Sequence, residues 1–202
     1  MPRQRTAKKK EKLLKKEAPR LIQQTTGAKL PKVFFEDEAR FGRINNVSRC
    51  WVPKNKRAAV KKQIIREHTY VFSAVCPLEG DSYSLITPVC NTEAMNELLH
   101  SLSDAYKDEQ LLVFADSAGW HRSKELKTPA NIQLKLLPPY SPELNPVEHL
   151  WDYIREQKGF NNHTFPSMDQ LENHLEEILK NLNQEKDYLQ SLCTFNWMIN
   201  SP

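Results

Sequence analysis

The amino-acid sequence predicts an α/β fold in which helices flank a mixed β-sheet. Two β-rich runs follow each other as a meander, and buried strands then alternate with amphipathic helices. Acidic residues stand where several of these strands end or helices begin, which is where open α/β sheets place their sites. With 202 residues, 39% apolar and 9% aromatic, one main domain with appendages is expected.

Charge is distributed unevenly along the chain. Residues 1–20 hold nine Lys and Arg against two acids, a balance of +7, whereas the remainder holds 20 against 23, a balance of −3. This pattern is typical of a folded domain with a basic arm that seeks nucleic acid. We therefore expect a tail or linker over residues 1–30 that contacts nucleic-acid phosphates through Lys8, Lys9 and Lys10. A solvated basic helix without a partner is the alternative.

The first strand is expected at residues 33–35, an apolar run that ends in the acids Glu36, Asp37 and Glu38. A short run at 49–52 follows, and Trp51 within it is interpreted as a core side chain, like Trp151.

Two further β-rich runs, at 69–76 and 82–89, are separated by turn residues and predict an antiparallel hairpin. Buried strands are also expected at 111–115, which ends in Asp116, and at 132–137, which stops at two prolines.

Apolar residues at helical spacing predict the helices. Asn91 or Thr92 caps the first, whose inner face holds Ala94, Met95, Leu98, Leu99 and Leu102. Asn145 and Pro146 open the second, whose inner face holds Val147, Leu150, Trp151 and Ile154. A third is expected over residues 168–182, and its apolar stripe should pack on the core; the segment up to Trp197 should be helical too.

Three carboxylates stand out by position. Asp37 follows the first strand, Asp116 follows a central strand, and Glu148 lies in the first turn of a helix. Two like charges about 4 Å apart repel by roughly 4 kcal/mol at an effective dielectric of about 20, so such a cluster needs a cation. Oxygen ligands select Mg²⁺ or Mn²⁺, and two such ions would serve phosphodiester cleavage.

Each acid also has a purely structural interpretation. Glu148 fits the N3 position of a capping box, and Asp116 could end a strand or form a turn. Asp37 has Glu36 and Glu38 as rivals. Spacing along the chain does not establish that the three acids meet in space.

The segments FFEDE at 34–38, VFADSAGWH at 113–121 and LPPYSPELNPVE at 137–148 resemble the three catalytic motifs of mariner-type DDE transposases, in the branch found in bacterial insertion sequences. The resemblance implies a ribonuclease-H-like DDE catalytic domain over residues 31–160, two Mg²⁺ or Mn²⁺ ions, and DNA strand cleavage followed by strand transfer. Carried over residue by residue, Asp37 matches the first acid, Asp116 the second and Glu148 the third.

This chain departs from the family pattern in small ways. Asp116 and Glu148 are separated by 31 residues, fewer than is usual, which fits a shortened loop at 128–131. Ser117 stands where many members have Asn, and it need not bind metal. His121 matches a common family histidine, expected either at the edge of the site, near DNA, or as a cap of the helix that follows.

Double-stranded DNA, as transposon ends and target, is the partner that the resemblance implies. A second DNA surface is expected on the basic loop with Lys54, Lys56 and Arg57, and solvated charge is the alternative. Arg40 and Arg43 could contact a phosphate of the scissile strand, with structural ion pairing equally open. A homodimer is left open, and no small-molecule substrate is expected.

The expected function is a transposase catalytic core that performs metal-dependent strand cleavage and transfer at transposon ends. The alternative is a non-catalytic DNA-binding fragment that regulates a full-length transposase. A ribonuclease acting on hybrids would share the acids but not the long proline motif. Full-length relatives carry helix-turn-helix modules before this domain, so the chain is expected to begin near the linker.

Residues 161–202 are expected to form a helical extension. Cys50, Cys76, Cys90 and Cys193 show no zinc-type spacing and are expected to be reduced and mostly buried. No apolar stretch approaches the roughly 18 to 20 residues of a membrane span, so a cytoplasmic, nucleoid-associated protein is expected in a bacterial host.

Overall fold

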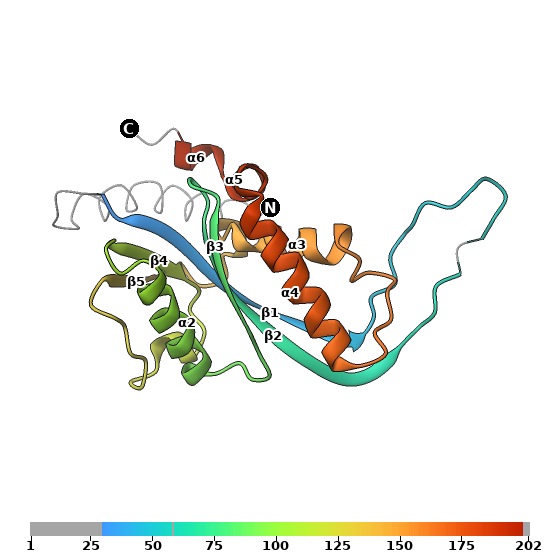
Figure 1. The fold of residues 1–202 in the computed structure, drawn as a ribbon, viewed down its shortest axis with the longest axis horizontal. Coiled ribbons are helices and arrows are strands. Elements are labelled where there is room, and N and C mark those ends of the chain that lie inside the picture. The colour runs from blue at the N-terminus through green and yellow to red at the C-terminus, as the bar shows by residue number, and fades with distance from the viewer. Residues whose placement is uncertain (1–29, 58, 200–202) are drawn as a thin grey trace.

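The computed structural model describes residues 30–57 and 59–199. Lys8, Lys9, Lys10 and nearly all of the expected basic tail lie outside this range. In the described part of the chain, five strands form one sheet in the order β3-β2-β1-β4-β5 (Figure 1). Their bounds are β1 Lys32–Ile44, β2 Ile64–Cys76, β3 Asp81–Thr87, β4 Leu111–Ala115 and β5 Ile132–Leu136.

The sheet is mixed, as predicted. Strand β1 pairs antiparallel with β2, and β2 pairs antiparallel with β3 to form the expected hairpin. Strands β4 and β5 are parallel to β1 and to each other. Because β1 pairs with β4 only as far as Phe35, its second half extends beyond the end of β4.

Strand β1 is much longer than predicted. It continues through Asp37 to Ile44, so the prediction that Asp37 follows the strand is wrong. Pairing with β2 runs from Phe35 opposite Val75 to Ile44, and it buries Ala39 and Phe41 on one face. The acids at 36–38 interrupt the apolar run but not the period-two alternation that continues beyond them.

The run at 49–52 belongs to a projecting loop, residues 45–63, that joins β1 to β2; we call it the arm (Figure 1). Trp51 in this arm is fully exposed, so its interpretation as a core side chain is wrong, whereas Trp151 is buried as predicted. The arm base is held by Asn45, whose Oδ1 accepts from Gln63 N (2.8 Å) and whose Nδ2 donates to Lys61 O (2.8 Å).

Helices cover both faces of the sheet (Figure 1). Helix α2 (Thr92–Ala105) covers one face, and its five predicted inner residues are buried. Helices α3 (Val147–Gln157), α4 (Met168–Gln184) and α5 (Lys186–Cys193) cover the other. The remaining helical turns are η1 (Trp120–Arg122), η2 (Pro142–Leu144) and α6 (Asn196–Ile199).

The long C-terminal helix α4 packs on the core as predicted. Leu171, Leu175, Ile178 and Leu182 are all buried against the sheet and α3, where each side chain contributes on the order of 1.5–3 kcal/mol. Side-chain caps begin two of the helices: Asn91 Oδ1 accepts from Ala94 N (2.9 Å), and Ser167 Oγ accepts from Gln170 N (3.2 Å).

The four cysteines are free thiols, of which Cys76 and Cys193 are buried and Cys50 is exposed. Among the described residues, no helix is long and apolar enough to cross a membrane.

Candidate active site

The three candidate carboxylates line one pocket. Asp37 in β1, Asp116 directly after β4 and Glu148 in the first turn of α3 all face a cavity of about 410 Å³. The proline-rich loop at 137–142 closes another side of it. Three elements that are distant in sequence therefore deliver acidic side chains to the same volume.

The pleat of β1 selects Asp37 over its two acidic neighbours. Phe35 and Ala39 belong to the core cluster beneath α3 and α4, and Asp37 alternates in phase with them. Trp151 of α3 donates its indole N–H to Asp37 Oδ2 (2.8 Å). Glu36 and Glu38 point to the opposite face of the sheet and do not line the pocket.

Register between two parallel strands explains why Asp37 and Asp116 are neighbours. Phe35 of β1 lies opposite Phe114 of β4, with the rings stacked at 5.2 Å between centroids. Each aspartate follows its phenylalanine by two residues and so emerges on the same face. Asp116 Oδ1 accepts from Ala118 N (2.7 Å), which fixes the carboxylate in a local turn.

Glu148 does not serve as part of a capping box. Such a box needs a free backbone N–H at the helix start, but Pro146 has none and Asn145 N donates to Pro142 O (2.9 Å). Asn145 itself ties the loop to the sheet, since its Nδ2 donates to Glu36 O (2.9 Å) and its Oδ1 accepts from Val147 N (3.2 Å). The Glu148 side chain is therefore left to face the pocket.

The electrostatics of the pocket disfavour three ionised acids. Burial raises the pKa of Asp37 to about 7. The hydrogen bond from Trp151 lowers this pKa, whereas nearby negative charges, that of Glu148 among them, raise it further. Burial likewise raises the pKa of Glu148, which the charge of Arg155 lowers and that of Asp116 raises. A divalent cation would relieve this repulsion, and an all-oxygen donor set suits Mg²⁺ or Mn²⁺.

Ser117 has a structural role in this pocket. Its hydroxyl donates to Leu137 O (3.1 Å), which joins the end of β4 to the end of β5. This agrees with the expectation that Ser117 need not bind metal.

His121 lies behind Asp116, with its side chain fully buried. Nδ1 is 3.0 Å from Asp116 Oδ1 and 3.1 Å from Asp116 O. Contact with the site is thus favoured over helix capping, but a buried imidazole does not reach DNA, so the DNA-contact prediction for His121 is not supported by its position.

Two pocket residues were missed by sequence reasoning. Arg122 is exposed at the pocket, and Tyr140 stands 96% exposed at its rim with a positive φ of 56°. Tyr140 lies inside the proline motif, and Arg122 follows the family histidine, so position alone could have suggested both.

The predicted basic residues have different surroundings. Arg43 is 12% exposed and pairs with Glu67 (2.5 Å), while its guanidinium also donates to Phe165 O (2.9 Å) and Pro166 O (2.6 Å); this favours structural ion pairing. Arg40 is exposed and lines a hollow of about 450 Å³ together with Arg66 and Arg155. We call this hollow the arginine groove.

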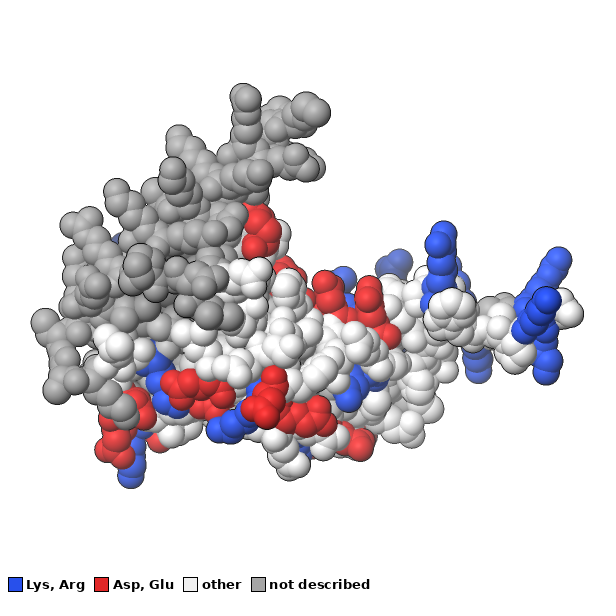
Figure 2. Space-filling model, turned by 90° about the horizontal axis from the view of Figure 1, so that it is seen from above, with Lys and Arg blue, Asp and Glu red and all other residues white. Residues whose placement is uncertain are grey.

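The arm gathers positive charge. Residues 45–63 contain no acid and six basic residues, namely Arg49, Lys54, Lys56, Arg57, Lys61 and Lys62. Figure 2 shows Lys and Arg on the projecting part of the molecule, whereas acids and bases are mixed over the visible part of the body.

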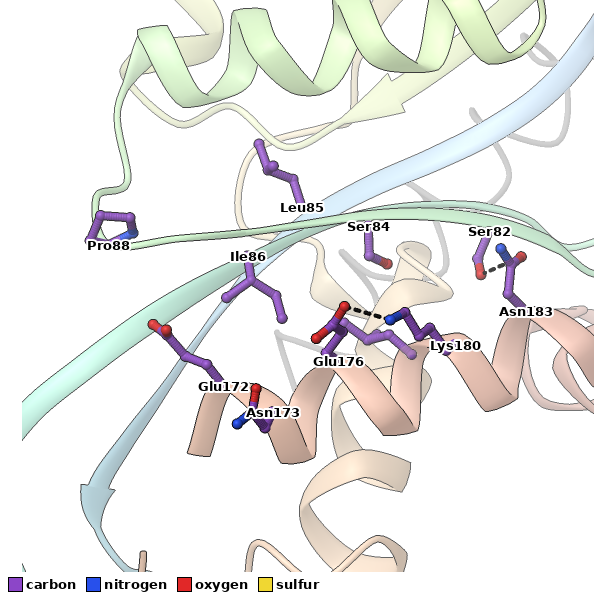
Figure 3. Close-up of a pocket in the computed structure, with 11 residues that line it drawn as sticks. Ser82, Ser84, Leu85, Ile86, Pro88, Glu172, Asn173, Glu176, Lys180 and Asn183 are labelled. Carbon is purple, nitrogen blue, oxygen red and sulfur yellow. Dashed lines mark hydrogen bonds and ion pairs between the residues drawn. The ribbon is translucent and has the colours of Figure 1, made fainter. Parts of the chain in front are cut away.

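Another hollow of about 530 Å³ lies between β3 and α4 (Figure 3). Its polar side chains pair with one another, as in the Glu176–Lys180 ion pair (2.6 Å) and the Ser82–Asn183 hydrogen bond (3.3 Å). None of the three carboxylates lines it.

A mixed sheet in this order, with one acid in β1, one directly after the adjacent β4 and one in a following helix, defines the ribonuclease-H-like class of proteins. Within that class, the chain belongs to the DDE superfamily endonuclease family, whose model matches residues 32–172.

Comparison with individual proteins agrees with this assignment. An uncharacterised protein of Sinorhizobium fredii, y4pE/y4sA, is 42% identical over 106 residues, which cover 52% of this chain and 78% of that protein. A pre-cleavage Mos1 transpososome has a TM-score of 0.61 at 16% identity, covering 96% of this chain and 59% of the Mos1 chain. The Mos1 mariner paired-end complex with Mn matches with a TM-score of 0.61 at 15% identity, covering 97% and 62%.

The TM-scores of these matches to Mos1 establish the fold. The chain spans about three fifths of the length of the Mos1 chains that it matches.

Proposed function

We propose that this chain is the catalytic core of a transposase, of the branch found in bacterial insertion sequences, that cleaves DNA at transposon ends and transfers the cut strand to a target. The observation that carries the proposal is the convergence of Asp37, Asp116 and Glu148 on one pocket. Membership of the DDE endonuclease family supports this reaction type, and the Sinorhizobium relative supports the bacterial branch.

The carboxylates fit a divalent-metal site by their donor chemistry and by their mutual repulsion. Divalent ions held by Asp37, Asp116 and Glu148 would activate a water or a 3′-hydroxyl and stabilise the leaving oxygen. An in-line displacement has an attacking and a leaving oxygen, and one ion beside each would stabilise both, so we propose two ions.

The chain's own groups position the acids. The Trp151 indole holds Asp37, the turn at 116–118 holds Asp116, and the loop with four prolines between 138 and 146 presents Glu148 on the rigid start of α3. Positions fixed in advance lower the cost of bringing a phosphodiester, an attacking oxygen and the acids into line.

A path for DNA is proposed from the pocket to the arm. Arg122 and Tyr140 at the pocket rim offer a phosphate contact and a surface for base stacking. Arg155 lies near enough to Glu148 to lower its pKa, and it also lines the arginine groove with Arg40 and Arg66. The basic arm begins at this groove, whose lining includes Asn46.

Double-stranded DNA is the proposed partner. The matched Mos1 structures are a pre-cleavage transpososome and a paired-end complex. A complex that pairs two transposon ends supports the further proposal that this protein acts as a homodimer.

The test is a nicking assay on supercoiled plasmid that carries the ends of the protein's own element, with Mn²⁺ as the metal. We expect Asp116→Ala to lose more than about 100-fold in rate, beyond the 10–100-fold that loss of an outer-shell partner costs. The matched control is Asp108→Ala, an exposed acid after α2, which should nick like the wild type. Equal nicking by Asp116→Ala and the wild type would exclude catalysis by Asp116.

The alternative, a non-catalytic regulator, predicts a different outcome. If the chain were such a regulator, the wild type and Asp116→Ala would bind the plasmid equally tightly. Neither protein would nick it with any metal.

A further inference from the structure

Behind the active site, on the opposite face of β1 from Asp37, three titratable side chains meet in the protein interior. The His121 Nε2 atom lies 3.4 Å from Glu36 Oε2 and 3.0 Å from Glu38 Oε1. The side chains of Glu36 and His121 are fully buried, and that of Glu38 is 7% exposed. The proposed DNA cleavage does not use this cluster.

Several polar atoms of this cluster have no hydrogen-bond partner. Both carboxylate oxygens of Glu36 and the Nε2 of His121 are buried and unsatisfied, whereas Glu38 Oε1 accepts from the indole of Trp120 (2.6 Å). Burying a carboxylate without a partner is costly, because the charge loses its hydration and gains no compensating contact. Such a cluster is stable only if something positive lies among its atoms.

The contacts of His121 on its other side identify its tautomer. Nδ1 faces two acceptors, Asp116 O and Asp116 Oδ1, so Nδ1 carries the proton. In the neutral ring the lone pair of Nε2 then points at the oxygens of Glu36 and Glu38. A lone pair that faces two carboxylates is repelled by both.

We propose that Glu36, Glu38 and His121 bind one divalent transition-metal ion, Zn²⁺ being the best suited, at a site separate from the three catalytic carboxylates. Each residue offers one donor atom, and these three atoms lie within 4.8 Å of one another. Within residues 30–57 and 59–199, this is the group of three His, Cys, Asp or Glu side chains found at such a spacing. Tetrahedral zinc with bonds of about 2.0–2.1 Å separates its ligand atoms by about 3.3 Å, close to the spacing around Nε2.

The donor set also favours zinc over magnesium. Imidazole is a ligand for zinc, copper, iron and nickel, whereas Mg²⁺ prefers oxygen and water. A metal-bound histidine commonly donates its second ring N–H to a carboxylate, which is the relation between His121 and Asp116. A water would supply the fourth ligand.

This ion would be structural, with an effect on the active site through His121. Zinc on Nε2 fixes the proton on Nδ1 and so fixes the hydrogen bond to Asp116 Oδ1. The residues around the ion belong to β1 and to η1, which the hydrogen bond from the Trp120 indole to Glu38 Oε1 also joins. Binding would therefore stabilise the fold as well as orient Asp116.

The experiment measures metal content and thermal stability rather than activity. The protein is purified without chelators, dialysed against excess Mg²⁺ to clear the catalytic pocket of tighter metals, and analysed by elemental mass spectrometry. We expect close to one zinc per chain, and a fall in Tm when a chelator removes it, because a ligand that binds only the folded state stabilises it.

Variants separate the two sites. Glu36→Gln and Glu38→Gln keep the side-chain shape. Both variants should lose zinc, and their Tm should no longer fall when a chelator is added. Glu148→Gln, in the catalytic pocket, and Glu156→Gln, exposed on α3, should keep both the zinc and the fall in Tm.

Two results would overturn the zinc site. One is a folded wild-type protein that takes up no zinc and has the same Tm with and without chelator, which would mean that protons bridge the three groups. The other is equal zinc content in the wild type, Glu36→Gln and Glu38→Gln. The wild-type measurement decides the question even if the variants fail to fold.

Discussion

Asp37 is an aspartate whose protonation is strongly altered by the fold. Burial, followed by the negative charges nearby, moves its pKa from the ordinary 3.8 to about 7. Between these two values the folded chain holds a proton that the unfolded chain has released. Metal-free stability should therefore fall as pH rises through this window, since the folded state binds more protons than the unfolded state.

We predict that the Tm of the metal-free protein, measured from pH 4 to pH 8, falls relative to that of Asp37→Asn as the pH increases. The substitution removes the titrating group, so the difference between the two curves isolates its contribution. Parallel curves over the whole range would contradict a raised pKa at this position.

Trp151 is the second residue on which the site depends, because its indole N–H holds the carboxylate of Asp37. Trp151→Phe keeps an aromatic ring in the core but removes the N–H that donates to Asp37 Oδ2. We expect Mn²⁺ affinity at the catalytic pocket to fall by about 10–100-fold, as is usual for outer-shell partners. Calorimetric titration would measure it.

The matched control for Trp151 is Trp120→Phe. It removes the analogous indole N–H, which donates to Glu38 Oε1 on the other face of β1. Mn²⁺ affinity in the catalytic pocket should change little in this variant. Equal losses in both variants would argue for a general packing effect.

At the level of single residues, the sequence indicated the three acids but not the side chains that contact and position them. Motif similarity selected Asp37, and the period-two alternation with Phe35 and Ala39 could have done so independently. The contacts of Glu36 and Glu38 with His121 join positions far apart in the chain, so no local pattern could indicate them.

Among the elements, helix α4 shows how the C-terminal part completes the core. Leu175 is completely buried beneath the helix, against the core on the α3 side of the sheet. We predict that Leu175→Ala lowers the free energy of unfolding by about 2–5 kcal/mol. Glu177→Ala, exposed on the same helix, should change it by less than about 0.5 kcal/mol.

Chemical denaturation of both α4 variants checks this prediction. If Leu175→Ala were as mild as its control, α4 would not be an integral part of the folded core.

Element prediction succeeded where burial is local and periodic. The helices α2, α3 and α4 each have an apolar stripe and a defined start, so their extents and inner faces were predictable. The prediction ended β1 too early because acids occupy the middle of the strand. It also placed Trp51 of the arm in the core, because tryptophan is usually buried. Pairing with β2 as far as Ile44 shows that β1 continues beyond the acids, in phase with the alternation of Phe35, Ala39 and Phe41.

For the whole molecule, the uneven charge of the surface suggests how DNA lies across it. The arm extends from the body as a basic projection (Figure 2). The arginine groove lies at its base, where Asn46 is among the lining residues. Each phosphate contact contributes about −0.9 to the slope of log affinity against log salt concentration.

We predict that replacing Lys54, Lys56 and Arg57 by alanine makes this slope shallower by about 2–3 units, as three lost phosphate contacts require. The matched control replaces three exposed lysines that line neither the carboxylate pocket nor the arginine groove, Lys107, Lys124 and Lys127. Fluorescence anisotropy at several salt concentrations would measure both slopes. The same slope for the arm variant and the control would remove the arm from the DNA path.

The central claim is that Asp37, Asp116 and Glu148 form one metal site, and crystals grown with Mn²⁺ test it most directly. Anomalous difference density should place manganese in the pocket. Each of the three carboxylates should be a ligand of at least one manganese ion. Manganese bound without Glu148, or found only beside Glu36, Glu38 and His121, would contradict the proposed catalytic site.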